Sequence, residues 1–132
     1  MCIETGQIVW VNGPFDAGRH DVTIFKEDGL KDMLADEECV EVDNGYQGDI
    51  KFKNPKISQS RKDRKEKSAV RARHEIVNGR LKQFEVLNSV FRHNIDMRAK
   101  HEMCFNAVAV ITELGFEYGN GLYDVEYNPE YD

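Results

Sequence analysis

The strongest constraint on the fold of this chain is a regular apolar pattern between residues 68 and 91. Apolar residues recur there at steps of three, four and seven, the spacing that places side chains on one face of an α-helix. A long amphipathic helix is therefore predicted, even though Gly79 lies inside it. Its apolar face would consist of Val70, Val77, Leu81, Phe84, Leu87 and Phe91.

A second helix is predicted from about residue 97 to residue 114, where the same spacing returns. Gly115 follows the last apolar residue, a position at which glycine often ends a helix. The face expected to pack in the core consists of Met103, Ala107, Val110, Ile111 and Leu114.

The first half of the chain is predicted to contain strands. Residues 6–13, GQIVWVNG, are a continuous apolar run typical of a buried strand. Residues 39–43, CVEVD, alternate and end in the turn residues Asn44 and Gly45, and a shorter strand-like piece covers residues 50–53. A helix is expected to start near Asp21 and to be interrupted at Gly29, and most of residues 48–67 are expected to form a loop. These elements predict an α/β fold.

Length and composition indicate one soluble domain covering residues 1–132. No apolar run approaches the roughly 20 residues that cross a bilayer, so we expect no membrane role. The N-terminus resembles neither a secretory signal nor a transit peptide, which predicts a nuclear or cytoplasmic protein that is not secreted. The three cysteines form no CxxC pair and are expected to be reduced thiols.

Charge is strongly segregated along the chain. Residues 51–82 hold 12 Lys and Arg against three acids, a net charge of +9, whereas the remainder holds 6 basic and 21 acidic residues, a net charge of −15. Such a segment is typical of a DNA-facing patch whose cations contact phosphates, and a solvated, salt-bridged surface is the alternative. The candidate DNA contacts are Lys62, Arg64, Lys65, Lys67, Arg71 and Lys82.

Two carboxylates are candidate metal ligands. Asp43 ends the predicted strand 39–43, and Glu75 follows on the predicted long helix, in line with Arg71 and away from the apolar face. Carboxylates from a strand end and a helix can hold Mg²⁺ for phosphodiester chemistry. Asp43 can instead be a turn-former, and Glu75 can be an exposed partner of Arg71.

Histidines and cysteines give weaker signals. His93, His101 and Cys104 do not match a usual zinc spacing, so core or surface roles are favoured. His74 lies on the line between Val70 and Val77 and is expected to pack in the core.

Four blocks of the sequence resemble the DDE superfamily endonucleases, the transposase family of Harbinger-type DNA elements. The resemblance extends from about Gly6 to Leu114, and residues 115–132 form an acidic tail. Its most specific motifs are D-x-G-Y at residues 43–46 and R-x-R-x-E at residues 71–75, followed by G-R-L-K; the other blocks are WVNGPFDAGRHDVTIF and FRHNIDMRAKHEMCFNAVAVITEL. The resemblance implies a ribonuclease-H-like fold in which three acids hold Mg²⁺ or Mn²⁺, with the second acid at Asp43 and the third at Glu75.

The resemblance leaves one acid unmatched. The family's first acid lies on a strand upstream of the block that resembles QIVWVNG, and before Gln7 this chain offers only Glu4. Asp21 resembles the start of a family helix, for which capping is the simpler role. The chain is therefore expected to be the C-terminal part of a catalytic domain, an incomplete ribonuclease-H-like fold.

The expected function is metal-dependent cleavage or strand transfer of DNA, with Asp43 and Glu75 as the catalytic acids and with DNA, and a separate DNA-binding protein, as partners. One alternative is a non-catalytic transposase-derived remnant that binds nucleic acid or a protein. Another is a truncated gene product with no function of its own. A nuclease assay with Mg²⁺ or Mn²⁺ separates the first two hypotheses.

Overall fold

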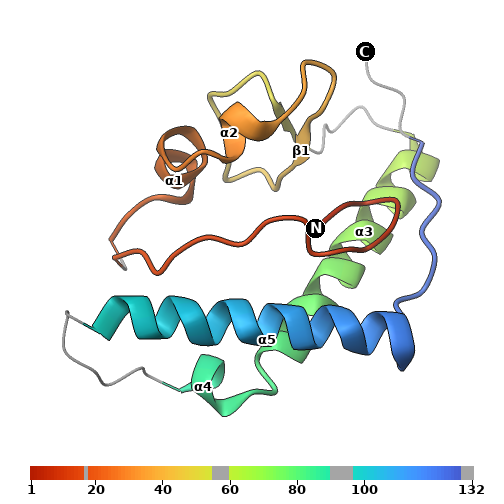
Figure 1. Ribbon diagram of the computed structural model, residues 1–132. Helices are drawn as coiled ribbons and strands as arrows, with labels where there is room; N and C mark the ends of the chain where they lie inside the picture. The colour runs from red at the N-terminus through yellow and green to blue at the C-terminus, as the bar shows by residue number, and fades with distance from the viewer. Residues whose placement is uncertain (17, 55–59, 90–96, 129–132) are drawn as a thin grey trace. The chain divides into compact units, whose positions relative to one another are not determined.

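The computed structural model describes residues 1–16, 18–54, 60–89 and 97–128 (Figure 1). The chain divides into two compact units, which we call the terminal unit (Met1–Pro14 and Lys65–Asp132) and the central unit (Phe15–Arg64). No helix among the described residues is both long enough and apolar enough to cross a membrane.

The central unit contains two short helices and a small parallel sheet. Its elements are α1 (Asp21–Glu27), α2 (Leu30–Met33), β1 (Val40–Glu41) and β2 (Phe52–Lys53). The register of the sheet pairs Val40 with Phe52 and Glu41 with Lys53. Both strands lie inside segments predicted as strands. Gly29 separates the two helices at φ +93°, a conformation that glycine adopts most easily, so the predicted interruption is confirmed.

Aromatic rings form the core of the central unit. Phe25 of α1 and Phe52 of β2 are buried, and their ring centroids lie 4.6 Å apart. The rings of Tyr46 and Phe52 are nearly perpendicular, and their centroids lie 6.3 Å apart. Such tilted and edge-on arrangements are the favoured geometries for aromatic pairs. Together these rings hold α1 against the end of the sheet.

The long helix α3 (Arg61–Leu81) starts earlier than the sequence pattern predicted. The backbone N–H of Asp63 donates to Ser60 Oγ at 3.1 Å, and the backbone N–H of Ser60 donates to Asp63 Oδ2 at 3.2 Å. This reciprocal arrangement is a capping box, which satisfies two backbone donors at a helix start. The prediction of a loop up to residue 67 is therefore wrong, because the basic residues after Ser60 are good helix formers.

α3 also ends earlier than predicted. After Leu81 the chain forms turns at residues 82–84 and then the short helix α4 (Glu85–Asn88). Val70 and Val77 are buried as expected, whereas Leu87 is half-buried and belongs to α4. Phe91, the last residue of the predicted apolar face, lies outside the described residues. The apolar spacing in the sequence thus continues beyond Leu81, the residue at which α3 ends.

The buried face of α3 carries charged as well as apolar side chains. Asp63, Glu66 and Arg73 are all buried on it, together with the two valines. Asp63 belongs to the capping box, Glu66 accepts a hydrogen bond from the backbone N–H of Asn128 at 3.0 Å, and Arg73 donates to the carbonyl of Ile3 at 2.9 Å. Burying a charged group costs less free energy when the group is hydrogen-bonded. These contacts to the backbone therefore allow the charged side chains on the buried face of α3 to pack.

The segment after the last helix runs along α3 in the opposite direction (Figure 1). We call residues 119–128 the C-terminal strap. Arg80, near the end of α3, donates to the carbonyl of Asn120. Tyr123 donates from its hydroxyl to the carbonyl of Ala69 at 2.8 Å, and Asn128 reaches Glu66 near the start of the helix. The strap therefore follows α3 from its C-terminal turns toward its N-terminal turns.

Helix α5 (Arg98–Tyr118) is longer than predicted and packs through a different face. Val108, Ala109 and Thr112 are buried, whereas all five residues that were predicted to enter the core are exposed. The predicted end at Gly115 is also wrong, because the helix continues through this glycine for another three residues. The exposed large apolar residues of α5 are Met103, Val110, Ile111, Leu114 and Tyr118.

Residues 6–13, predicted to be a buried strand, form no strand in the structure. The backbone N–H of Gly6 donates to Cys2, and that of Cys2 donates to the carbonyl of Gln7, so the chain makes a small loop here. The backbone N–H of Ile8 donates to Glu113 Oε2 at 2.9 Å. A side chain of α5 thus satisfies this backbone donor in place of a β-ladder partner.

Candidate functional site

The candidate metal ligand Asp43 lies in a tight turn directly after β1. Its Oδ1 accepts a hydrogen bond from the backbone N–H of Gly45 at 2.8 Å, and its carbonyl accepts from the N–H of Tyr46 at 3.2 Å. This side-chain contact two residues on is an Asx-turn. Asp43 is exposed, so its carboxylate faces solvent while one oxygen orders the turn. The predicted turn-forming role of Asp43 is thereby confirmed.

Asn54, which follows the neighbouring strand β2, fixes this turn. Its Nδ2 donates to the carbonyl of Asp43 at 2.7 Å and to the carbonyl of Tyr46 at 2.6 Å. Asn54 directly follows β2, so both strand ends contribute to the same turn. The backbone of the D-x-G-Y motif is consequently held at both ends.

Tyr46 connects the turn to the start of α1. Its hydroxyl donates to Asp21, the first residue of that helix. This hydrogen bond, partial burial, and the negative charges of Asp21 and Asp43 raise the pKa of Tyr46 to about 12. Asp21 was expected to cap the helix, but the N-cap residue is His20 and the Asp21 carboxylate accepts the Tyr46 hydroxyl.

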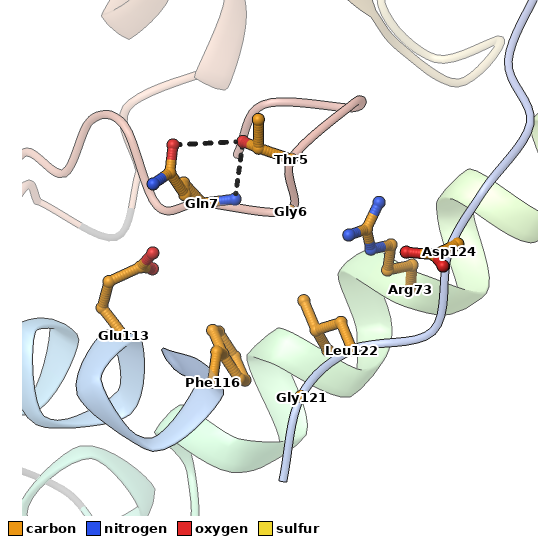
Figure 2. Close-up of a pocket in the computed structure, with 9 residues that line it drawn as sticks. All are labelled: Thr5, Gly6, Gln7, Arg73, Glu113, Phe116, Gly121, Leu122 and Asp124. Atoms are coloured by element: carbon orange, nitrogen blue, oxygen red, sulfur yellow. Dashed lines mark hydrogen bonds between the residues drawn. The ribbon is translucent and has the colours of Figure 1, made fainter. Parts of the chain in front are cut away.

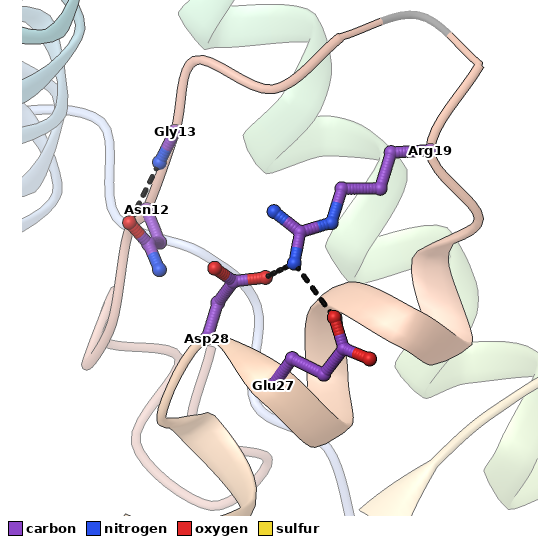
Figure 3. A network of polar contacts seen from close by, with 5 residues as sticks. All are labelled: Asn12, Gly13, Arg19, Glu27 and Asp28. Carbon is purple, nitrogen blue, oxygen red and sulfur yellow. Dashed lines mark hydrogen bonds and ion pairs between the residues drawn. The ribbon is translucent and has the colours of Figure 1, made fainter.

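Three ion pairs made by two basic residues, Arg19 and Lys31, lie in the described part of the central unit. Arg19 Nη2 lies 3.0 Å from Glu27 and 2.9 Å from Asp28, so one guanidinium spans the end of α1 (Figure 3). Lys31 Nζ lies 2.7 Å from Asp49, whose side chain is only 2% exposed. The hydrogen bond from Lys31 is the main cause that holds the pKa of Asp49 below its usual value, so this carboxylate is ionised and engaged in structure.

The second candidate ligand, Glu75, is exposed on α3. Arg64 and Arg71 are exposed as well, and the spacings of four and eleven residues place them on the same face of the helix as Glu75. This face is opposite to the one that carries Val70 and Val77. Asp43 belongs to the central unit and Glu75 to the terminal unit, so their pairing on one metal ion stays a prediction.

The other candidate DNA contacts divide into two classes. Lys62, Lys65 and Lys82 are exposed, Lys82 in the turn that follows α3. Lys67 is only 5% exposed, so its ammonium is withdrawn from the surface on which the other cations lie. We therefore leave Lys67 out of the surface considered below.

The weaker candidates of the sequence give no site. His74 is exposed and not packed in the core as expected. His101 and Cys104 are half-buried on α5, and His93 lies outside the described residues. Among the residues that the structure describes, no three His, Cys, Asp or Glu side chains gather as ligands for one metal ion.

A small polar pocket of about 170 Å³ lies in the terminal unit (Figure 2). Arg73 lines it from α3, Glu113 and Phe116 line it from α5, and Asp124 lines it from the C-terminal strap. Arg73 is 3% exposed and its Nη2 lies against Gly6, where an added Cβ would be 2.3 Å away. Sequence reasoning missed the structural role of Arg73, although the R-x-R spacing placed it on the face opposite to Arg71.

Comparison with known proteins identifies the family. A family model described as DDE superfamily endonuclease matches residues 1–113. The chain belongs to the DDE superfamily endonucleases. No curated protein and no solved structure gives a significant match.

The match to the DDE superfamily endonucleases confirms the family resemblance seen in the sequence. It covers both candidate acids, both specific motifs and most of α5, whereas the C-terminal strap lies beyond it. A DDE superfamily endonuclease is expected to have a ribonuclease-H-like fold, and the described residues form helices and one small parallel sheet. The family match extends across both compact units, and the assignment of residues 1–132 to a single domain stays a prediction.

Proposed function

We propose that this DDE superfamily endonuclease chain is part of a Harbinger-type catalytic domain that cleaves DNA or transfers its strands with Mg²⁺ or Mn²⁺. Asp43 and Glu75 are the proposed ligands of the ion, and a ribonuclease-H-like fold with its first strand missing from this chain is the proposed framework. The family match over residues 1–113, which includes both acids in their motifs, is the observation that carries this proposal.

The two acids have the chemistry that a hard divalent cation requires. Mg²⁺ and Mn²⁺ prefer oxygen ligands such as carboxylates, and Mg²⁺ usually retains several bound waters. Asp43 and Glu75 are both exposed, and the Asx-turn engages one oxygen of Asp43 with a backbone donor. The ion would supply charge stabilisation and activation of the attacking oxygen at the phosphodiester.

The ordered turn would contribute positioning of the Asp43 carboxylate. Asn54 holds two carbonyls of the turn, and Tyr46 anchors it to Asp21 and to the ring of Phe52. A ligand whose backbone is fixed in this way loses less conformational freedom when it binds a metal ion. The D-x-G-Y motif is therefore explained as a rigid support for one acid.

The exposed face of α3 is the proposed DNA contact. Arg64 and Arg71 lie on the same face of α3 as Glu75. Three exposed lysines lie within or next to this helix in the sequence: Lys62, Lys65 and Lys82. Cations beside a metal-binding acid would hold the phosphate backbone and would give salt-dependent binding with little sequence specificity. We place the protein in the nucleus, where it would act with a separate DNA-binding protein that supplies sequence recognition.

A nuclease assay with purified protein, plasmid DNA and Mg²⁺ or Mn²⁺ tests the proposal. Metal-dependent nicking that falls to background in Asp43→Asn and in Glu75→Gln is the result that supports the proposal. Asp36→Asn, which neutralises another exposed acid of the central unit, serves as the matched control and should cut normally. Circular dichroism of each variant establishes that the fold is kept.

Binding measurements separate the proposal from its rival. Titration with Mn²⁺, followed by calorimetry, should show a site that is weakened in both acid variants and retained in the control. If the protein retains DNA but neither cuts it nor binds Mn²⁺ through Asp43 and Glu75, the chain is a non-catalytic remnant and the nuclease proposal is wrong.

A further inference from the structure

Helix α5 has an exposed apolar face opposite to its packed face. Val108, Ala109 and Thr112 are buried within the terminal unit, whereas Met103 is 71% exposed and Tyr118 is 78% exposed. Large apolar side chains gathered on one helix face are typical of an interaction surface. Its other large members are Val110, Ile111 and Leu114, each about half exposed.

Six positions along this face are spaced as in a helix that pairs with another helix. Starting at residue 100, they follow one another at steps of three, four, three, four and three. This is the a and d spacing of a heptad repeat, which aligns side chains toward a partner helix. The six residues are Lys100, Met103, Ala107, Val110, Leu114 and Glu117.

We propose that α5 pairs in antiparallel orientation with α5 of a second copy of this chain. In an antiparallel pair related by a two-fold axis, residue i of one helix faces residue j of the other, and residue j faces residue i. If the axis passes between residues 108 and 109, Met103 faces Leu114 and Ala107 faces Val110 in the second copy. The four apolar positions then contact one another without a gap, and Ala107 allows close approach at the centre.

Charge at the two ends of the face supports this orientation. The same register places Lys100 of each copy beside Glu117 of the other, so two opposite-charge contacts enclose the apolar positions. A parallel pair would instead set lysine against lysine and glutamate against glutamate. Like charges across an interface are unfavourable, so the ends of the face select the antiparallel pair. Lys100 and Glu117 are both exposed and available for such contacts.

The test is a charge-reversal cycle measured by sedimentation equilibrium on the full chain. Wild type should associate reversibly to a dimer, and Lys100→Glu and Glu117→Lys should each weaken the dimer by roughly tenfold, because each change creates two like-charge contacts. The double variant Lys100→Glu/Glu117→Lys should restore the affinity. Glu102→Lys makes the same charge change as Glu117→Lys outside the six positions and should leave the dimer unaffected.

A second variant tests the apolar contacts. Leu114→Glu places a charge at a position that faces Met103 and should leave the protein monomeric, with circular dichroism showing the same helix content. A wild-type protein that stays monomeric at millimolar concentration overturns the proposal. So does a dimer that the single reversals leave unchanged, or one that the double variant fails to restore, since its contacts then lie elsewhere.

Discussion

Gly6 is the residue whose missing side chain matters most to the terminal unit. It has φ +78°, and a Cβ there would lie 2.3 Å from Arg73 Nη2. We predict that Gly6→Ala lowers the free energy of unfolding by about 2 kcal/mol, because the backbone conformation disfavours alanine by about 1–2 kcal/mol and the buried guanidinium must also move. Urea denaturation measures the loss.

Gly79 provides the matched control for this substitution. It lies within α3, is exposed, and an added Cβ would meet nothing within 4 Å. Gly79→Ala should therefore raise the free energy of unfolding by about 0.5–1 kcal/mol, the usual helix preference for alanine. Equal effects at the two positions would show that Gly6 does not pack against Arg73.

Tyr46 should titrate at a higher pH than an unperturbed tyrosine. Its pKa is raised to about 12 from an ordinary value of 10.0, chiefly by the hydrogen bond to Asp21. The stabilisation from this hydrogen bond is complete below pH 10 and is lost as the pH rises through about 12, because the folded state holds the proton more tightly than the unfolded state. Tyrosinate absorbance after a rapid pH jump should show one late component.

Two variants assign that late component. Tyr46→Phe should remove it, and Asp21→Asn should shift it toward pH 10 because the carboxylate charge is lost. A component near pH 12 that persists in Asp21→Asn would mean that burial, and not the aspartate, raises the pKa of Tyr46.

At the level of elements, the start of α3 depends on a contact between two side chains and two backbone groups. Ser60 and Asp63 each accept a hydrogen bond from the other's backbone N–H. Ser60→Ala should lower the free energy of unfolding by about 1 kcal/mol, a typical cost for an N-cap serine. Ser60→Asp should retain most of the stability, since aspartate is an equally good N-cap residue. Thermal unfolding of the three proteins tests both expectations, and equal stability of Ser60→Ala and wild type would contradict the capping box.

The elements also show which parts of the fold the sequence predicted. Local signals succeeded: the Gly29 break, the turn at Asp43 and the two strands were found from residue type and short spacing. Positions set by distant contacts were missed. Ile8 donates to Glu113, a residue 105 positions away, and no local pattern reveals that contact. On α5 the spacing identified the helix correctly, but periodicity alone does not say which of two faces packs inside the same chain.

The candidate site shows the same division. The alternation of residues 39–43 predicted that Asp43 lies at the end of a strand, and in the structure Asp43 comes two residues after the end of β1. Lys67 was grouped with its neighbours by charge alone, yet it is buried while Lys65 is exposed. The difference follows from the 100° turn between successive helix positions, which became predictable only once residues 61–67 were known to be helical.

For the molecule as a whole, the separation of charge sets how it would meet a polyanion. The net charge of −6 opposes approach to DNA, whereas residues 51–82 carry a net charge of +9. Attraction to DNA must then arise from a local surface, and its strength must depend steeply on salt because bound counterions are released. Exposed cations on α3 are the proposed source of that attraction.

The salt dependence of DNA binding therefore distinguishes surface cations from buried ones. For each phosphate contact that is lost, the slope of log K against log salt concentration should become shallower by about 0.9. We expect Arg64→Ala/Arg71→Ala to reduce the slope by about 1.8, because both guanidinium groups are exposed on one face of α3. Lys67→Met removes one positive charge from a side chain that is only 5% exposed, so it should leave the slope unchanged while altering stability. Fluorescence anisotropy with labelled duplex DNA over a range of salt concentrations measures all three slopes. If Lys67→Met reduces the slope as much as one arginine does, the phosphates contact a surface other than the exposed face of α3.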